Sequence, residues 1–511
     1  MKRKYITRAA YIFAGLYLCL SCSKDFIEVQ PKATALEANY YTNEAEVFAG
    51  LVSVYDPLGK EAGSTYSNKI GALNSASDDC YAGGGSSTDM SMWQAWNNFT
   101  LTPANGPQVD LWARNFTGIS RANTMLSKLP DAPVSEANRS RYTAECKFLR
   151  AYYYFDLVRL FRNVPLFVKP IEAAEIYSVT QAAPEDVYKQ IELDLTDAIP
   201  ALPSIIQTSD NGRVSAGAAT ALLGKVILFQ NDESRMAHVA ELFKDVNGPT
   251  PGQLNAKYNY NLLSNFGDIF SPENKFNTES IFEIVHTSSA KLGWGDWGKD
   301  FEGNVAVQMV GPRGYSGPIY VAGWGFNPIT ESLAAVIKND PRYKYTVANI
   351  DSIDAVNFAA TGKHLYEKGY QNTGYFIQKF APLQKYKSTA GGNSELNYPN
   401  DYIEIRLADT YLMEAEALVR AGDASGRAQD LLDAVRARVG LASVAATLDN
   451  IYNERRLELA TEGHRFFDLV RTKKAATALA FKGFVEGKHE ILPIPLAELT
   501  NTKLVQNEAY K

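Results

Sequence analysis

Residues 216–229 read AGAATALLGKVILF, and this stretch decides the fold class. It holds small residues in its first half, large apolar residues in its second half and no proline, so it predicts a helix. Asn231-Asp232 interrupts the pattern, which resumes at helical spacing with Ala237, Ala240 and Phe243. Two helices joined by so short a break form a hairpin, and the small residues let them approach closely.

The same arrangement returns elsewhere in the chain. Residues 407–418 (LADTYLMEAEAL) predict a helix, Gly422-Asp423 a turn, and residues 428–435 the second helix of a hairpin. Helices are also predicted over 184–198, where proline and two acids open the first turn, and over the aromatic stretch 144–161. Such hairpins are tetratricopeptide-like, but they are imperfect and far apart, so we expect a mainly α scaffold and no regular solenoid.

The remaining sequence is of a different kind. Residues 60–115 and 245–400 are rich in Gly, Asn, Ser, Pro and aromatic residues, with a short strand predicted over 280–285. Long irregular loops on a rigid scaffold are where binding residues usually lie. All six tryptophans fall in these two regions, at Trp93, Trp96, Trp112, Trp294, Trp297 and Trp324.

The N-terminus predicts a lipoprotein signal peptide over residues 1–21. A basic segment precedes an apolar run from Ala9 to Leu20, which is too short to span a membrane. Ser21 then precedes Cys22, the cysteine that we expect to carry lipid. The alternative is ordinary secretion with cleavage nearby. No later stretch is long and apolar enough to span a membrane, so the predicted attachment is this lipid alone.

Charge and cysteine content narrow the function classes. Removing residues 1–21 deletes four basic residues and no acidic ones, which takes the net charge from −6 to −10. A chain so acidic is a poor partner for nucleic acid. Cys80 and Cys146 are the cysteines left besides Cys19 and Cys22. They could pair in an oxidising envelope, but Cys146 sits in an apolar helical stretch, which favours two buried thiols.

Nothing in the sequence indicates an enzyme, a metal site or a cofactor. The five histidines are scattered and form no HExxH motif, and no GxSxG stretch is present. Gly217 to Lys225 has the wrong spacing for a phosphate loop. Asp78-Asp79 could be half of a glycosidase pair, but nothing supplies the second carboxylate. We therefore expect a binding protein.

Several blocks together resemble the SusD/RagB family of nutrient-binding outer-membrane lipoproteins, in one order over nearly the whole mature chain. The blocks are RYTAECKFLRAYYYFDLV (141–158) with NVPL (163–166), RLAD (406–409) with EAEA (414–417), ERRLEL (454–459), EGHRFFDLVR (462–471), LPIP (492–495) and Gln506-Asn507.

This resemblance implies a SusD-like fold, a place on the outer face of the outer membrane, and a SusC-like TonB-dependent transporter as partner. Asp25 and Glu28, soon after Cys22, suit surface export. The implied task is to capture an oligosaccharide and deliver it to that transporter. Two alternatives stay open: a peptide-binding member of the family, and a tetratricopeptide-like docking scaffold. We expect an N-terminal SusD-like region over 22–240 and a C-terminal SusD/RagB region over 241–511. The two are expected to fold together as one compact unit.

The motif residues themselves predict structure more than binding. Glu454, Glu458 and Glu462 recur every four residues on one helical face, near several arginines, and favour an ion-pair network. Four consecutive aromatics, residues 152–155, point all round a helix and favour packing.

Ligand contacts are expected from the loops, because flat rings cover the C–H faces of a pyranose while polar side chains meet its hydroxyls. The family likewise implies an arc of loop aromatics. The alternative is that these rings fill the core beneath the loops. The candidate ligand-binding residues are Asp78, Asp79, Trp93, Trp96, Asn97, Trp294, Asp296, Trp297, Arg313, Tyr315, Tyr320 and Trp324.

Overall fold

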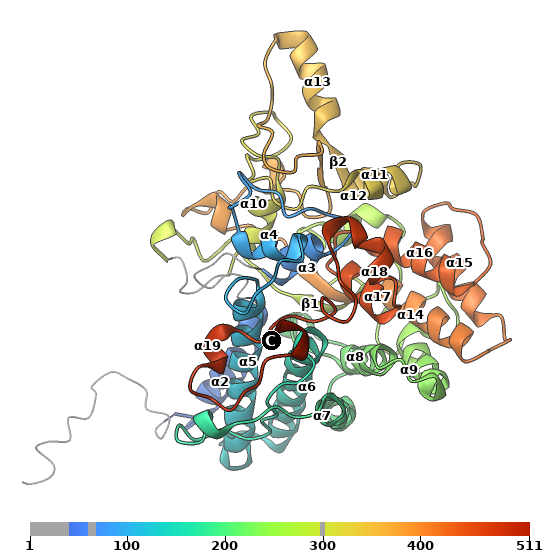
Figure 1. Ribbon diagram of the computed structural model, residues 1–511. Helices are drawn as coiled ribbons and strands as arrows, with labels where there is room; N and C mark the ends of the chain where they lie inside the picture. Colours follow the sequence, from blue (N-terminus) through green and yellow to red (C-terminus); the bar gives the residue numbers. More distant parts are fainter. Residues whose placement is uncertain (1–39, 60–67, 297–301) are drawn as a thin grey trace, which may run out of the picture.

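The structure is a computed structural model that describes residues 40–59, 68–296 and 302–511 (Figure 1). It is mainly helical, as the sequence predicts. The α-helices are α2 (Glu44–Gly59), α3 (Lys69–Ala76), α4 (Ser91–Asn97), α5 (Gln108–Lys128), α6 (Glu136–Phe161), α7 (Pro184–Ala198), α8 (Ala216–Phe229), α9 (Met236–Asn247), α10 (Val305–Val310), α11 (Glu331–Ile337), α12 (Tyr343–Thr346), α13 (Ile350–Thr361), α14 (Leu407–Arg420), α15 (Arg427–Arg438), α16 (Leu448–Leu459), α17 (Arg465–Arg471), α18 (Ala475–Ala478) and α19 (Leu496–Leu499). The strands are β1 (Ser280–Ile284), β2 (Val347–Asn349), β3 (Tyr375–Ile377) and β4 (Tyr402–Arg406).

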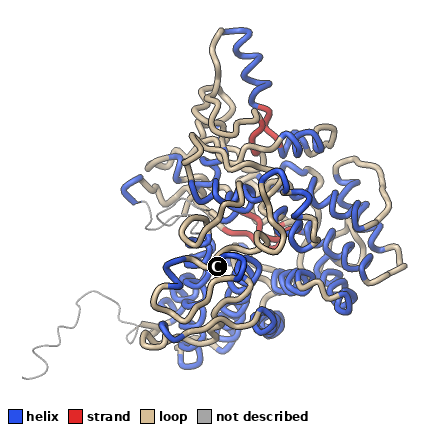
Figure 2. Tube along the Cα trace, in the orientation of Figure 1, coloured by secondary structure: helices blue, strands red, loops and turns tan. Residues whose placement is uncertain are grey.

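Helices and loops separate in space. Figure 2 shows the long helices gathered in the lower and right parts of the view, whereas the upper part is mostly loop around β2, β3 and the protruding α13. The helical part contains the α5–α9 run together with α14–α17 (Figure 1). This is the predicted helical scaffold with long loops on one side.

The predicted hairpins are present. Helix α8 packs on α9, α14 packs on α15, and α14 also contacts α9. Ser215 caps α8 by accepting a hydrogen bond from the amide of Ala218. Close approach explains Gly224: a Cβ added there would lie 2.9 Å from the ring of Phe243. The turn residue Asn231 has φ 56°, a left-handed conformation that asparagine tolerates.

Helix α6 is buried over most of its second half, and its aromatic run packs in the core. Tyr152, Tyr153, Tyr154 and Phe155 are all buried. Tyr153 donates its hydroxyl hydrogen bond to the carbonyl of Val54, 2.7 Å away. The prediction that these rings serve packing is therefore confirmed.

Two short antiparallel sheets complete the fold. Strand β1 pairs with β4, and the predicted strand over 280–285 is confirmed in this position. Strand β2 pairs with β3 in the loop-rich part, and the sequence analysis missed this pair. Each of these two strands is three residues long, too short for a period-two pattern to be visible.

One hydrophobic core runs from Val47 to Ile494 and includes residues from both 22–240 and 241–511. The division into those two segments stays a prediction. Cys80 and Cys146 are buried free thiols, as expected. No helix of the described residues is long and apolar enough to cross a membrane.

The glutamate stripe on α16 forms a buried ion-pair network, which confirms its structural role. The carboxylate of Glu458 contacts Arg342 at 2.8 Å, Arg406 at 2.6 Å and also Arg438. Burial alone would raise the pKa of Glu458, but these three guanidinium groups outweigh burial and hold it well below its usual value. These three arginines lie 20 or more residues from Glu458 in sequence, whereas the arginines next to the glutamates along the chain are not the main partners.

Candidate functional site

Trp93 and Trp96 lie in the core and not on the surface. Both side chains are 0% exposed. Trp93 covers Gly71, where an added Cβ would lie 2.0 Å from the indole, and meets the ring of Phe326 edge-on with centroids 5.6 Å apart. Trp96 packs edge-on against Phe466. Rings enclosed in this way offer no face to a sugar, so their place in the ligand site is corrected to a packing role.

The polar residues near these tryptophans are also structural. Asp78 forms a two-point ion pair with Arg465, with Nε–Oδ1 2.8 Å and Nη2–Oδ2 2.9 Å. Asp79 pairs with Arg456 at 2.8 Å. Burial would raise the pKa of Asp78, but Arg465 and Arg456 outweigh it and lower the pKa. Both carboxylates are thus held by cations, which accounts for them without a ligand.

The side chain of Asn97 binds the backbone of a neighbouring loop. Its side-chain oxygen accepts a hydrogen bond from the amide of Ala82 at 3.1 Å, and the residue is 1% exposed. It therefore fixes the loop after Cys80 and does not face solvent.

Tyr315 and Tyr320 belong to a small second core beneath the loops. The rings of Tyr315 and Tyr320 meet edge-on with centroids 5.4 Å apart. Tyr366 and Phe376 belong to the same buried cluster. The hydroxyl of Tyr320 donates to Gln378 at 2.8 Å, and burial raises the pKa of Tyr320 to about 12. These two rings support the loops from below, which corrects their predicted place in the site.

Trp294 and Trp324 are the candidate rings that reach the surface. Their centroids lie 6.1 Å apart with an interplanar angle of 26°. Trp294 is 39% exposed and Trp324 is partly buried. A sugar ring between two aromatic faces needs roughly 7–8 Å, twice a van der Waals contact, so nothing fits between them. A ligand would therefore contact the pair from outside, mainly at the exposed part of Trp294.

Hydrogen bonds hold the indole of Trp294 and the backbone of both tryptophans. The indole nitrogen of Trp294 donates to the carboxylate of Glu395 at 3.0 Å, and its backbone amide donates to the side chain of Asn393 at 3.2 Å. The amide of Trp324 donates to the carbonyl of Gln308 at 3.2 Å. Because the Trp294 ring is held by this bond and packs against Trp324 before any ligand arrives, little ordering of that ring remains to be done on binding.

Arg313 stands beside this pair. One of its guanidinium nitrogens donates to the carbonyl of Trp324 at 3.3 Å, and another lies 3.7 Å from the carboxylate of Glu367. The side chain is 36% exposed. Rings with adjacent charged groups can cover the apolar face of a sugar and bind its hydroxyls at once. We name Trp294, Trp324, Arg313, Glu367 and Glu395 the tryptophan platform.

The other candidates of this segment stay open. Asp296 ends the 3₁₀ turn η9 (Trp294–Asp296), and Trp297 lies outside the described residues. Cys22 and residues 1–21 also lie outside them. Among the residues that the structure does describe, no group of three or more His, Cys, Asp or Glu side chains is placed to hold a metal ion.

Sequence reasoning missed Glu367 and Glu395. Both lie in polar loops many residues away from the tryptophans that they accompany. No local pattern marks them, since only the folded chain brings residues 294, 324, 367 and 395 together.

Known families and proteins match the chain over nearly all of its length. A model of the SusD family matches residues 278–510, and a model described as starch-binding associating with outer membrane matches residues 25–228. A SusD-like protein from Formosa agariphila is 24% identical over 98% of this chain and 97% of its own length.

Two solved structures are closely similar. A laminarin binding SusD-like protein is 49% identical, with a TM-score of 0.86 over 92% of this chain and 100% of that one. Surface glycan-binding protein A from Bacteroides thetaiotaomicron, solved in complex with laminarihexaose, is 29% identical, with a TM-score of 0.82 over 91% of this chain and 100% of that one.

Proposed function

The chain belongs to the SusD/RagB family, and from that premise we propose that its tryptophan platform binds a glycan at the cell surface. The observation that carries the proposal is the fixed pair of Trp294 and Trp324, whose rings are 6.1 Å apart. Flanking carboxylates and a guanidinium suit the hydroxyl rim of a sugar.

We propose laminarin-type oligosaccharides as the ligand class. The relative that is 49% identical is named for laminarin, and a second structural neighbour was solved with laminarihexaose. The platform does not favour an anionic chain, because its one guanidinium, Arg313, lies 3.7 Å from the carboxylate of Glu367, and Glu395 adds a second carboxylate.

The platform predicts modest affinity. Aromatic contacts contribute about 0.5–1.5 kcal/mol each beyond buried area. Two rings with a few hydrogen bonds fit a Kd between micromolar and millimolar, since 1 mM corresponds to only about −4 kcal/mol. Such affinity suits a capture protein, which must release what it binds to a transporter. We propose capture without turnover, so this chain is not an enzyme.

The remaining parts of the proposal concern place and partner. We propose that Cys22 carries lipid, and that the protein works on the outer face of the outer membrane beside a SusC-like TonB-dependent transporter. A lipid-tethered protein stays near its partner at high effective concentration, so a modest interface suffices. Cys22→Ser should lose palmitate labelling and leave the membrane fraction. A mutant that still carries label would refute the anchor, and mild-detergent purification that never recovers a barrel would refute the partner.

The binding site is tested by calorimetry with laminarihexaose. We expect Trp324→Ala and Trp294→Ala each to weaken binding about tenfold, which is ~1.4 kcal/mol. Tyr177→Ala is the matched control, because Tyr177 is an aromatic residue that is 65% exposed outside the platform. Two tryptophan variants that bind as the unmodified protein does would place the glycan elsewhere. Binding of short peptides at the platform, with no binding of any glycan, would favour the peptide-binding alternative.

A further inference from the structure

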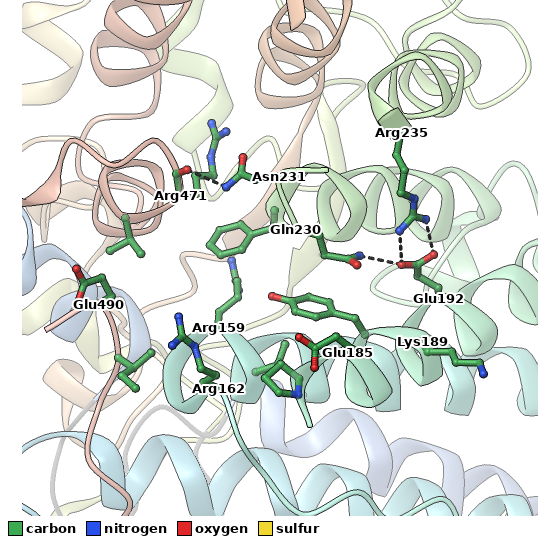
Figure 3. Close-up of a pocket in the computed structure, with 16 residues that line it drawn as sticks. Arg159, Arg162, Glu185, Lys189, Glu192, Gln230, Asn231, Arg235, Arg471 and Glu490 are labelled. Carbon is green, nitrogen blue, oxygen red and sulfur yellow. Dashed lines mark hydrogen bonds and ion pairs between the residues drawn. The ribbon is translucent and has the colours of Figure 1, made fainter. Parts of the chain in front are cut away.

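A second pocket, of about 590 Å³, lies within the helical part of the molecule (Figure 3). It opens between the C-terminal ends of α6, α8 and α17 and the first half of α7, and Glu490 and Ile491 complete its wall. No residue of the tryptophan platform lines it. Its volume lies in the range of about 300–1,000 Å³ that is usual for small-molecule sites.

One end of the pocket is closed by a fixed polar cluster. Arg235 binds the carboxylate of Glu192 through two contacts of 2.9 and 2.6 Å, and Gln230 donates to the same carboxylate at 2.8 Å. These groups satisfy one another and are not available to a ligand.

Two further cations in the pocket wall, Arg159 and Arg471, already form ion pairs within the protein. The guanidinium of Arg159 lies between the rings of Phe155 and Phe467, at 4.0 and 3.9 Å, and pairs with a carboxylate of its own helix. Arg471 contacts Glu416 at 2.6 Å. Both therefore shape the pocket and do not supply free charge.

Arg162 differs from them. Its guanidinium has no ion pair or hydrogen bond within the described ranges of the chain. Its backbone has φ 65° and ψ −77°, and the amide of Asn163 donates to the carbonyl of Phe161 at 2.9 Å. This is a γ-turn with positive φ at its central residue, a rare and strained conformation. Strain of this kind concentrates at functional sites, and the strained residue here carries an exposed side chain that lines the pocket.

Two carboxylates lie on either side of Arg162. Figure 3 shows Glu490 at the end of the pocket opposite the Glu192–Arg235 pair, and Glu185 on the other side of Arg162, nearer the middle of the pocket. Glu185 has no ion pair among the residues that the structure places, and Glu490 accepts one hydrogen bond, from the amide of Gly487. Three helices also end at this pocket, and helix C-termini favour a positive charge. The same small space thus suits one anionic group and one cationic group.

The middle of the pocket is aromatic. Tyr188 and Phe229 line it, and both are partly buried. Burial raises the pKa of Tyr188 to about 12, although Arg159 and Arg162 oppose this, so its hydroxyl remains a hydrogen-bond donor at neutral pH.

We propose that this pocket binds the zwitterionic head of a free α-amino acid. Its carboxylate would bind the guanidinium of Arg162 and its ammonium group the carboxylate of Glu185. An apolar side chain would then lie against Tyr188 and Phe229. A planar guanidinium suits a carboxylate because it can donate two parallel hydrogen bonds. A neutral glycan carries neither charge, so this site is a second one and its ligand class differs from that of the platform.

The test compares the binding of L-phenylalanine with that of two analogues that keep its side chain. N-acetyl-L-phenylalanine lacks the cation, and L-phenylalanine amide lacks the anion. We expect calorimetry to detect L-phenylalanine with the unmodified protein, and each analogue to bind at least tenfold more weakly. No binding of L-phenylalanine, or equal binding of either analogue, would overturn the proposal.

Variants locate the site. Arg162→Gly removes the guanidinium while glycine accepts φ 65° without strain, so the fold should be kept and binding should fall at least tenfold. Glu185→Gln should weaken binding similarly, whereas Asp186→Asn is the matched control, because Asp186 lies next to Glu185 but does not line the pocket. Unchanged binding by Arg162→Gly would overturn the proposal. Trp324→Ala should leave L-phenylalanine binding intact, which separates this result from any failure at the platform.

Discussion

The segment around Trp93 and Trp96 and the segment around Trp294 and Trp324 have similar compositions but different roles. Both are rich in Gly, and each holds two or three tryptophans. In the first segment the rings are 0% exposed, enclosed by Gly71, Phe326 and Phe466. In the second, Trp294 is 39% exposed and stacks with Trp324 at the surface.

Long-range partners make the difference. Trp93 and Trp96 sit on the short helix α4, which packs on α3, so their rings face inward. Trp294 sits in a 3₁₀ turn held by residues 393 and 395. Similar composition therefore does not give similar burial, because the tertiary contacts of each segment decide which ring a ligand can reach.

The largest effect is expected in the first segment. Trp93→Ala removes a fully enclosed ring, and large-to-small core changes of this kind cost about 3–5 kcal/mol. We expect a large fall in the denaturation midpoint in chemical unfolding followed by circular dichroism. Normal stability of this variant would show that Trp93 is not part of the core.

Charges in the same region give the next test. Arg465→Ala leaves the buried Asp78 with only Arg456, at 3.1 Å, and we expect a loss of about 3 kcal/mol, since breaking a buried pair leaves an uncompensated charge. Thermal unfolding measures it, and Lys474→Ala, which removes an exposed pair with Asp449, is the control. A stable Arg465→Ala variant that no longer binds laminarihexaose would return Asp78 to the list of ligand contacts.

The buried charges also predict a pH dependence. Burial would raise the pKa of Asp468, but Arg455 and Arg471 outweigh burial and lower it from 3.8 to about 2. The unfolded chain therefore binds this proton first as pH falls, so the contribution of Asp468 is complete above pH ~4 and is lost toward pH ~2. It amounts to about 2 kcal/mol. Urea unfolding at pH 7 and pH 3 should show the loss, and Asp468→Asn should reduce the difference; an equal difference in both proteins would contradict the assignment.

The sequence predicted the helical part of the fold well. The helices at 184–198 and 216–229 have the predicted bounds, because the first opens with Pro184 and two acids, the second is capped by Ser215, and both carry an apolar pattern. In the loops, the predicted irregular region 60–115 contains α3, α4 and the start of α5, so Trp93, Trp96 and Trp112 all lie in helices. Short helices amid glycine and asparagine lack the length that a periodic pattern needs.

The candidate site could be predicted only in part. Trp294, Trp324 and Arg313 do lie together, but Trp93, Trp96, Asp78, Asp79, Asn97, Tyr315 and Tyr320 lie elsewhere, in the core or beneath the loops. The residues that hold some of these side chains away from the platform are distant in sequence; Arg465, which pairs with Asp78, is one example. A single sequence holds no record of such pairings.

The most direct test measures both glycan binding and thermal stability for a variant of one tryptophan from each segment. For Trp324→Ala we expect laminarihexaose binding to weaken about tenfold, ~1.4 kcal/mol, with thermal unfolding close to that of the unmodified protein. For Trp93→Ala we expect the thermal midpoint to fall sharply, and glycan binding to persist in whatever protein stays folded. Calorimetry and thermal unfolding on the same two preparations would show this crossed pattern. If Trp324→Ala instead unfolds early and binds normally once folded, its ring is part of the core and the tryptophan platform is not the glycan site.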